Sequence, residues 1–497
     1  MGYDLIAAVD LGSNSFRLQV GRVVGNQIYP LDGLKETVRL ASGLTSGKTL
    51  DGPSQLRGLE ALARFGEMLR GFDRGAVRAV ATNTLRVAKN AAQFLAEAEA
   101  ALGFPIEVIA GREEARLIYL GVAHTLPAPQ VQHLVVDIGG GSTEFIVGRA
   151  FQPRLLESLY MGCVSYTMRF FPGGRVTKKL MKEAELAARK ELEAIAHAYR
   201  AAGWQEAVGS SGTAKAIVDL LELNALNPGG ATGITREGLE RLRGLLYEAG
   251  APARLKLEGL RPDRVPVLPG GVAIMSAVFR EFGLTRMTFS EGALRLGVLY
   301  DLLGRYHHED LREATVGNFM QRYEVDHRQA ARVGRTALRL LGEMAPEATI
   351  GGHPDRQFLS WAARLHEVGI SIAHSSYHKH SAYILENADM PGFSKRDQQR
   401  LARIVLGHRG KLDRVQAATR EAADWLLIFA LRTAALLHRS RDDGPEVPVR
   451  AGVTPRGFQL TVNEKWLEAS PLTAAALAEE CAQWDALGSQ LRVRKLR

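Results

Sequence analysis

The chain has 497 residues, of which 46% are hydrophobic and 24% charged, the composition of a globular protein that can bury sizeable cores. This length predicts roughly three or four domains. Only Cys163 and Cys481 occur, which excludes a disulfide scaffold, and no apolar run approaches the roughly 20 residues that span a bilayer, which excludes a membrane-spanning protein.

The formal net charge of +9 favours a polyanionic partner. Nucleic acid, an acidic membrane and a phosphate polymer are the three candidate classes, and a mildly basic surface without a partner is the alternative. The N-terminus enters an apolar strand at once, without the basic and apolar regions of a secretion signal. Together with the two cysteines, this predicts a cytoplasmic protein.

Residues 8–22 form an apolar strand, a turn of small residues and a second strand, a pattern that predicts a β-hairpin. Small residues in a turn let backbone N–H groups converge on an anion, because no side chain blocks the approach. Asp10, at the end of the first strand, is a candidate ligand of a hydrated Mg²⁺. The turn is therefore predicted to bind phosphate through Gly12, Ser13, Asn14 and Ser15.

The following segment alternates strands and helices. Residues 77–81 and 106–109 are predicted strands, and residues 85–102 have helical periodicity. Arg86 begins this helix directly after a strand and is a candidate phosphate ligand, while the hydroxyl groups beside it suit helix capping. Two prolines within residues 125–129 end the pattern, so we place a domain boundary after residue 126.

Two adjacent carboxylates, Glu113 and Glu114, open the helix after the strand at 106–109. Acidic residues in a first turn are favoured by the helix dipole, so simple capping is one explanation. The functional explanation is a carboxylate on a cleft wall that deprotonates an attacking water. Neighbouring residues lie about 100° apart around a helix, so only one of the two can point squarely into a cleft.

Residues 135–149 repeat the first hairpin, with Asp137 matching Asp10. Asp137 and Glu144 lie on opposite strands, so their carboxylates can approach each other and hold Mg²⁺ together with water and phosphate oxygens. The doubled hairpin resembles the actin, Hsp70 and sugar-kinase superfamily, whose two phosphate loops lie in two related α/β domains. The second candidate phosphate loop consists of Gly139, Gly140, Gly141 and Ser142.

A third candidate anion site lies at a predicted helix start, formed by Ser211, Gly212 and Thr213. Lys215 either reaches a phosphate from there or extends into solvent. From about residue 306 strand signals vanish and helices are predicted at 311–321, 326–344, 356–371, 380–388, 394–407 and 417–440. The chain is thus predicted to form two ribonuclease H-like α/β domains (1–126 and 127–306), a helical domain (307–441) and a small α+β domain (442–497).

Motifs at 10–18, 81–86, 113–118, 137–144 and 211–213 together resemble the exopolyphosphatase/guanosine pentaphosphate phosphatase (Ppx/GppA) family. Segments at 161–165, 171–174 and 365–384 look more like the exopolyphosphatases than their pentaphosphate-hydrolysing relatives. The resemblance implies Mg²⁺-dependent removal of terminal orthophosphate from inorganic polyphosphate, with K⁺ as a further candidate ion. It implies that Glu114 is the catalytic base and that Asp137 and Glu144 hold the metal or its waters. We expect a homodimer that binds polyphosphate and no nucleic acid, with peripheral membrane association at most.

The predicted helical domain resembles HD-type phosphohydrolases, which hold metals with His directly followed by Asp. This chain instead has His366 followed by Glu367, with His374, His378 and His380 nearby. Metal binding, polymer contact, dimer packing and ordinary helix-surface histidines are the alternatives.

Three other functions compete with exopolyphosphatase activity. The nearest is hydrolysis of guanosine pentaphosphate, with the same chemistry and another leaving group. A kinase would need a base pocket and a sugar-binding acid, and neither signature occurs. A phosphate-sensing or chaperone-like ATPase module fits the fold but leaves Glu114 and the basic excess unexplained.

Overall fold

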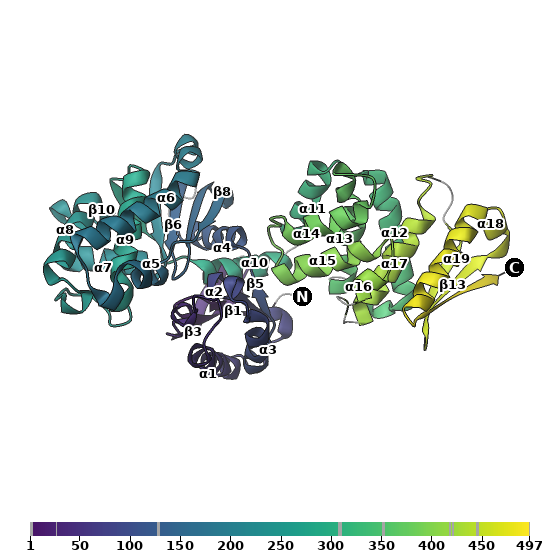
Figure 1. The fold of residues 1–497 in the computed structure, drawn as a ribbon, viewed down its shortest axis with the longest axis horizontal. Helices are drawn as coiled ribbons and strands as arrows, with labels where there is room; N and C mark the ends of the chain where they lie inside the picture. The colour runs from purple at the N-terminus through teal and green to yellow at the C-terminus, as the bar shows by residue number, and fades with distance from the viewer. Residues whose placement is uncertain are drawn as a thin grey trace. The chain divides into compact units, whose positions relative to one another are not determined.

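The structure is a computed structural model that describes residues 3–25, 27–126, 130–306, 311–349, 353–416, 419, 422–443 and 447–496 (Figure 1). The chain divides into two compact units, Met1–Asp310 and Leu311–Arg497. In the described part of the chain, every helix is too short or too polar to cross a membrane. The finer division into four domains stays a prediction.

The first sheet of the first unit has the strand order β3-β2-β1-β4-β5. Its strands are β1 (Leu5–Leu11), β2 (Phe16–Val24), β3 (Gln27–Glu36), β4 (Val77–Ala81) and β5 (Ile106–Val108). The predicted hairpin is present as the antiparallel pair β1–β2, and β4 and β5 extend the sheet in parallel. Helices α1 (Gly52–Met68) and α3 (Ala91–Leu102) share an apolar core with this sheet.

The predicted single helix over 85–102 is wrong. Two helices, α2 (Asn83–Val87) and α3, are separated by an extended residue, Ala88. The side chain of Asn90 exchanges two hydrogen bonds with the backbone of Leu50, at 2.9 and 3.1 Å, and so ties the break to a segment 40 residues away. Periodicity alone cannot reveal a break that tertiary bonds maintain.

The second sheet has the order β10-β11-β9-β6-β7-β8 and contains the second predicted hairpin as β6–β7. Its strands are β6 (Gln132–Ile138), β7 (Thr143–Arg149), β8 (Gln152–Leu159), β9 (Glu206–Ser210), β10 (Ile234–Thr235) and β11 (Arg286–Phe289). The helices that accompany it are α5 (Cys163–Phe170), α6 (Lys178–Ala202), α7 (Ser211–Leu223), α8 (Arg236–Ala249) and α9 (Leu268–Glu281). These elements enclose the second apolar core.

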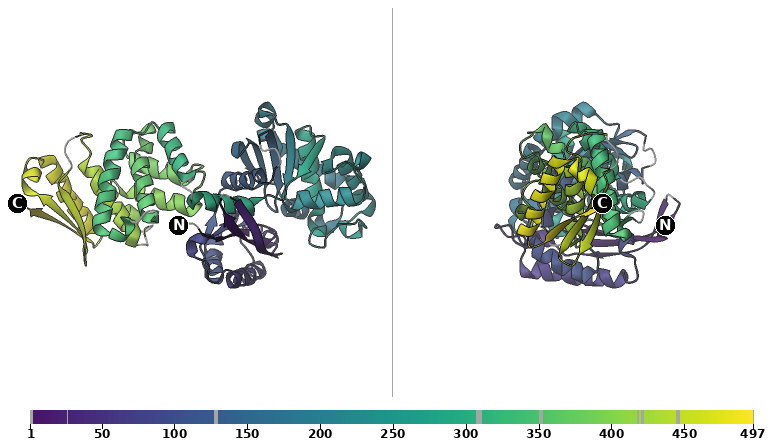
Figure 2. Two further views of the ribbon diagram at one scale, coloured as in Figure 1. Left: turned by 180° about the vertical axis from the view of Figure 1, so that it is seen from behind. Right: turned by 90° about the vertical axis from the view of Figure 1, so that its right-hand side faces the viewer.

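Helices α4 (Gly111–Ala123) and α10 (Leu294–Tyr306) pack between the two sheets (Figures 1 and 2). Their core includes Ile6 and Ala8 from β1 as well as Val135 from β6. The two helices approach closely because Gly297 lies against the backbone of Leu117, where any Cβ would overlap the carbonyl oxygen. This pair therefore joins the two halves of the first unit, and α4 also carries the two predicted cleft carboxylates.

The second unit confirms the predicted helical region with a small α+β tail. Its helices are α11 (Leu311–Arg322), α12 (His327–Met344), α13 (Pro354–Leu365), α14 (Tyr377–Asn387), α15 (Lys395–Gly407), α16 (Asp413–Gln416) and α17 (Ala422–Leu437). The tail consists of β12 (Val449–Thr454), β13 (Gly457–Asn463), β14 (Gln490–Leu496), α18 (Glu464–Glu468) and α19 (Pro471–Ala486). One continuous apolar core runs through helices and tail. Short 3₁₀ helices in the two units are η1 (Leu40–Gly43), η2 (Arg74–Ala76), η3 (Pro172–Gly174), η4 (Pro228–Gly230), η5 (Pro252–Arg254), η6 (Val265–Val267), η7 (Pro346–Thr349) and η8 (Val368–Ser371).

Candidate active site

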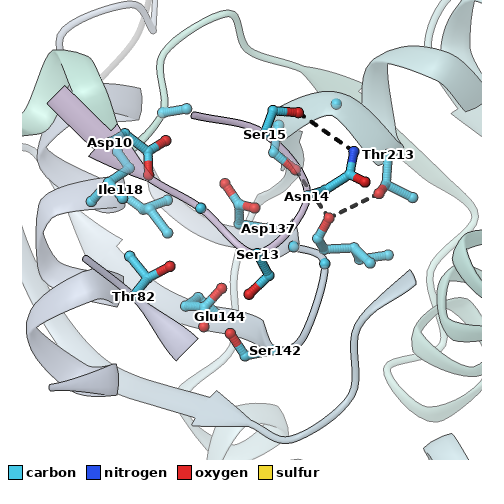
Figure 3. Close-up of a pocket in the computed structure, with 18 of the residues that line it drawn as sticks. Asp10, Ser13, Asn14, Ser15, Thr82, Ile118, Asp137, Ser142, Glu144 and Thr213 are labelled. Carbon is cyan, nitrogen blue, oxygen red and sulfur yellow. Dashed lines mark hydrogen bonds between the residues drawn. The ribbon is translucent and has the colours of Figure 1, made fainter. Parts of the chain in front are cut away.

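A cavity of about 130 Å³ lies between the β1–β2 turn and the β6–β7 turn (Figure 3). The two hairpins and the start of α7 line it with most of the predicted site residues, namely Asp10, Gly12, Ser13, Asn14, Ser15, Asp137, Gly139, Gly140, Ser142, Glu144, Ser211, Gly212 and Thr213. Glu114 reaches it from α4. The structure thus brings together segments from residue 10 to residue 213 around one phosphate-sized space.

The two turns touch each other. A Cβ at Gly140 would lie 3.0 Å from the Ser13 Cβ and 3.2 Å from the Asn14 nitrogen. Gly141 does not line the cavity; a Cβ there would overlap the side-chain oxygen of Asn83. These glycines therefore let the second turn close over the first, in addition to exposing backbone N–H groups.

Asp137 and Glu144 are direct partners across the β6–β7 ladder, and both are buried. The Ser210 hydroxyl donates to Asp137 Oδ2 over 2.6 Å, and the Ser158 hydroxyl donates to Glu144 Oε1 over 2.8 Å. Burial raises the pKa of Asp137, and burial together with the charges of Glu114 and Asp137 raises the pKa of Glu144 well above its usual value. A bound cation would offset the repulsion among these buried carboxylates.

Glu114 and its neighbour Glu113 point into different surroundings, because consecutive residues lie about 100° apart around a helix. Glu114 faces the cavity, where its Oε2 accepts a 2.7 Å bond from Arg86 Nη1. Burial raises the pKa of Glu114, and the Arg86 guanidinium acts in the opposite direction. Glu113 instead pairs with Arg116 through two bonds of 2.8 Å in a buried network.

Three further side chains that the sequence analysis considered have the following surroundings. Arg86 lines no phosphate space and instead holds Glu114 and the carbonyl of Ile109. Lys215 lies outside the cavity, where it pairs with Asp219 at 2.9 Å and lines an adjoining basic cavity. Thr82 makes no capping bond with its side chain, contrary to the prediction, and its side chain lines the cavity.

Sequence reasoning missed three arginines of the cavity: Arg17, Arg264 and Arg295. Arg17 had a signal, because it occupies in the first hairpin the position that Glu144 occupies in the second, and it pairs across the ladder with Asp10. Burial and the nearby Arg295 lower the pKa of Arg17 to about 10. An anion between these guanidinium groups would relieve both the burial cost and the repulsion.

A divalent cation fits this donor set. No group of three or more His, Cys, Asp or Glu side chains is arranged to hold a metal within the described ranges. Mg²⁺ needs only one or two carboxylates when water and phosphate oxygens complete its shell. The buried Asp10 Oδ1 has no hydrogen-bond partner among the described residues, and Asp137 and Glu144 lie beside the same cavity. One or two of these three residues could supply the carboxylate ligands.

Two family models together match most of the chain. The Ppx/GppA phosphatase family matches residues 19–306, and domain III of the Ppx/GppA phosphatases matches residues 311–481. The chain belongs to the Ppx/GppA phosphatase family. Members of this family hydrolyse phosphoanhydride bonds, so this Ppx/GppA phosphatase is a hydrolase of that class.

Two curated relatives match this Ppx/GppA phosphatase from end to end. A guanosine-5'-triphosphate,3'-diphosphate pyrophosphatase of Pseudoalteromonas translucida is 37% identical over 493 residues, 99% of this chain and 98% of the relative. A protein of the same name from Aeromonas hydrophila is 36% identical, covering 98% of each chain.

Solved structures agree on the actin-like fold of the Ppx/GppA phosphatase. The Aquifex aeolicus family member has a TM-score of 0.52 and 27% identity, covering 61% of this chain and 99% of that one. An exopolyphosphatase of Cytophaga hutchinsonii has a TM-score of 0.55 at 24% identity, covering 60% of this chain and 97% of that one, and is evidence for the fold alone. The predicted pair of α/β domains is confirmed at this level.

We expect Asp10→Asn to stabilise the metal-free protein at neutral pH. Burial raises the pKa of Asp10 from 3.8 to about 6, so the folded state binds more protons than the unfolded state between these values. Stability therefore falls as pH rises from about 4 to about 6 and stays lower above that window. The difference corresponds to about 3 kcal/mol at neutral pH. Chelator-treated protein should show a higher Tm for the variant at pH 7 and no gain near pH 3.

The matched control is Asp4→Asn, because Asp4 is exposed directly before β1, the strand that carries Asp10. This control should leave the pH profile of Tm unchanged. Equal pH profiles for wild type and Asp10→Asn would contradict the proposed burial of an ionised carboxylate.

Proposed function

We propose that this phosphatase removes the terminal 5'-phosphate of guanosine 5'-triphosphate 3'-diphosphate and releases orthophosphate. The observation that carries the proposal is the similarity of 36–37% over nearly the whole length to two pyrophosphatases named for that substrate. A cleft with two phosphate loops, buried carboxylates and arginines supports the same chemistry.

Two adjoining cavities support a substrate that extends beyond its terminal phosphate. The 130 Å³ cavity adjoins a second cavity of about 160 Å³, and the two share Arg17, Arg264 and Arg295. The second cavity adds Arg261 and Lys215, together with the ring of Phe289. The terminal phosphate would occupy the first cavity, and the remaining charged part of the substrate would lie along the second. Phosphate oxygens are matched by guanidinium groups in this arrangement.

Glu114 would act as general base toward the attacking water. Burial raises the pKa of Glu114, the Arg86 guanidinium acts in the opposite direction, and the bond to Arg86 holds one carboxylate oxygen in place. The two turns would hold the terminal phosphoryl group through backbone N–H groups, and Arg17 and Arg264 would balance its charge. Positioning and electrostatic stabilisation would supply most of the rate acceleration, as is usual in phosphoryl transfer.

Mg²⁺ would be held by Asp137, Glu144 and Asp10, or by a subset of them, together with water. When bound, it would neutralise negative charge on the phosphate oxygens. K⁺ is a weaker candidate for the same anionic cleft. We further propose that the protein is cytoplasmic and forms a homodimer. The free cysteines Cys163 and Cys481 support the reducing compartment but say nothing about the dimer.

We expect Glu144→Gln and Asp137→Asn each to raise the Mg²⁺ concentration that gives half-maximal rate by about 10-fold or more. The amides are nearly isosteric but lack the charge that attracts a hard divalent ion. Titration of initial rates with Mg²⁺ measures the effect. Glu157→Gln is the control, because Glu157 lies on the neighbouring β8 and pairs with Arg112 at 2.6 Å outside the cavity. Unchanged half-saturation in both cleft variants would leave these carboxylates a structural role.

Polyphosphate is the second candidate substrate, and the observation that favours it is the run of cations through the two adjoining cavities in a chain of net charge +9. The deciding experiment compares kcat/KM for guanosine 5'-triphosphate 3'-diphosphate, long-chain polyphosphate and ATP on the purified full chain. We expect the guanosine substrate to exceed polyphosphate by at least about 10-fold. A preference for polyphosphate would overturn the proposal in favour of the second candidate.

A further inference from the structure

The second unit contains a cavity of its own, of about 320 Å³, which none of the preceding chemistry uses. It is enclosed by the segment after α13, the end of α15, the C-terminal part of α17 and one face of α19. Its volume is at the lower end of the range for cavities that bind small organic ligands. Its lining includes four arginines, Arg409, Arg432, Arg439 and Arg441, and three glutamates, Glu367, Glu479 and Glu480.

Two buried histidines form the floor. His366 Nδ1 lies 2.8 Å from the carbonyl of Ala363, and His408 Nδ1 lies 2.5 Å from that of Val405, so each Nδ1 carries the proton and each Nε2 is an acceptor. Burial lowers the pKa of both imidazoles, which keeps them neutral. His408 Nε2 meets the Tyr377 hydroxyl at 3.3 Å, whereas His366 Nε2 has no hydrogen-bond partner within the described ranges.

The charges divide into paired groups and exposed ones. Arg432 binds both oxygens of Glu480, at 2.5 and 2.7 Å, and Arg441 binds one oxygen of Glu367 at 2.5 Å. Arg409 lies over the ring of Tyr377, and Arg439 donates to the carbonyl of Leu472, so neither guanidinium is matched by a carboxylate in the described structure. Both are exposed at the rim of the cavity, and each guanidinium retains donors for an anion.

A metal does not fit this arrangement as well as an anion does. Within the described ranges no three His, Cys, Asp or Glu side chains are arranged to hold a metal, despite the two neighbouring imidazoles. Two arginines at the rim would also repel a cation. Between the rim and the floor, the cavity has an apolar wall formed by Ile370, Ala435, Leu436 and Ala476.

We propose that this cavity is a second ligand site, which binds a purine nucleoside monophosphate. The phosphate would lie against Arg409 and Arg439 at the rim. The base would lie against the apolar wall and donate N–H groups to His366 Nε2 and to the Glu367 carboxylate on the floor. Acceptors on the floor and two arginines among the exposed lining residues, which also include Glu479, fit a ligand with an anion at one end and donors at the other. The proposal is independent of which substrate the catalytic cleft hydrolyses.

Calorimetric titration of the full chain with GMP tests this site, with ribose 5-phosphate and inorganic phosphate as probes that lack the base. The titration is done in the Arg17→Gln background, which weakens phosphate binding in the catalytic cleft. We expect one GMP per chain to remain, and the further double substitution Arg409→Gln/Arg439→Gln to weaken it by at least about 100-fold, since each charge-assisted contact is worth about 10-fold or more. Arg450→Gln, an exposed arginine on β12 of the same unit, is the matched control and should bind GMP normally.

Two outcomes would overturn the proposal. One is an unchanged GMP dissociation constant and stoichiometry in the double variant, which would place the nucleotide elsewhere. The other is equal affinity for GMP, ribose 5-phosphate and inorganic phosphate, which would mean that the floor recognises no base. Because both substituted arginines are exposed, an unchanged Tm confirms that the variant is folded.

Discussion

Glu114→Gln is expected to lower kcat by about 10²–10⁴-fold while substrate binding survives. The amide has nearly the same shape as the carboxylate but cannot accept the proton of the attacking water. Glu114 is the carboxylate of α4 that faces the cavity, and its side chain accepts a hydrogen bond of 2.7 Å from Arg86. Single-turnover rates and the dissociation constant of the substrate, measured separately, distinguish a lost base from lost binding.

Glu113→Gln is the informative comparison, because it makes the same chemical change one residue away. Glu113 points into the buried network with Arg116, so its substitution should reduce stability more than the chemical step. A near-wild-type kcat for Glu114→Gln would refute its role as base. A dead but stable Glu113→Gln variant would mean that the other face of α4 turns to the substrate during catalysis.

Much of the cleft could be predicted because each of its two hairpins is formed by one short continuous segment of the sequence. Each hairpin is a strand, a turn of small residues and a strand, so Asp10 and Asp137 are placed at strand ends by the pattern alone. The approach of Asp137 to Glu144 also follows from their positions on the two strands of one hairpin, and the two residues are cross-strand partners in the structure. Helix geometry shows that only one of Glu113 and Glu114 can face the cleft, and it is the family resemblance that points to Glu114.

The rest of the cleft depends on contacts between distant segments. Arg264 precedes a 3₁₀ helix and Arg295 lies in α10, and no motif connects either with the hairpins. Arg86 reads as a phosphate ligand in sequence, because its partner Glu114 is 28 residues away. The contact of the two turns at Gly140 leaves no pattern in the sequence, and neither does the 320 Å³ cavity of the helical unit. Local pattern fixes the elements, whereas packing decides which side chains share a cavity.

A buried ion network behind the cleft predicts a large loss of stability for Arg78→Met. Arg78, on β4, is only 2% exposed and binds Asp301 of α10 at 2.6 Å and Glu107 of β5 at 3.0 Å. Arg116 of α4 binds the same Asp301 at 2.5 Å. Removing one partner of a buried ion pair leaves a desolvated charge behind, which typically costs about 3–5 kcal/mol. Urea unfolding of the variant should show this loss in the transition of the first unit.

The same network predicts that Arg78→Met also loses activity, although Arg78 does not line the cavity. It fastens α4 to the first sheet and to α10, and α4 carries Glu114, for which a displacement of about 1 Å can cost about 10²-fold in rate. We therefore expect a lower kcat even at urea concentrations at which the variant is fully folded, with a smaller change in the substrate KM. Arg74→Met is the matched control, since Arg74 is exposed three residues before β4 and should cost less than about 0.5 kcal/mol. A stability loss under about 1 kcal/mol in Arg78→Met would contradict the predicted role of the network in stability. Full kcat in a clearly destabilised variant would show that the network does not position Glu114.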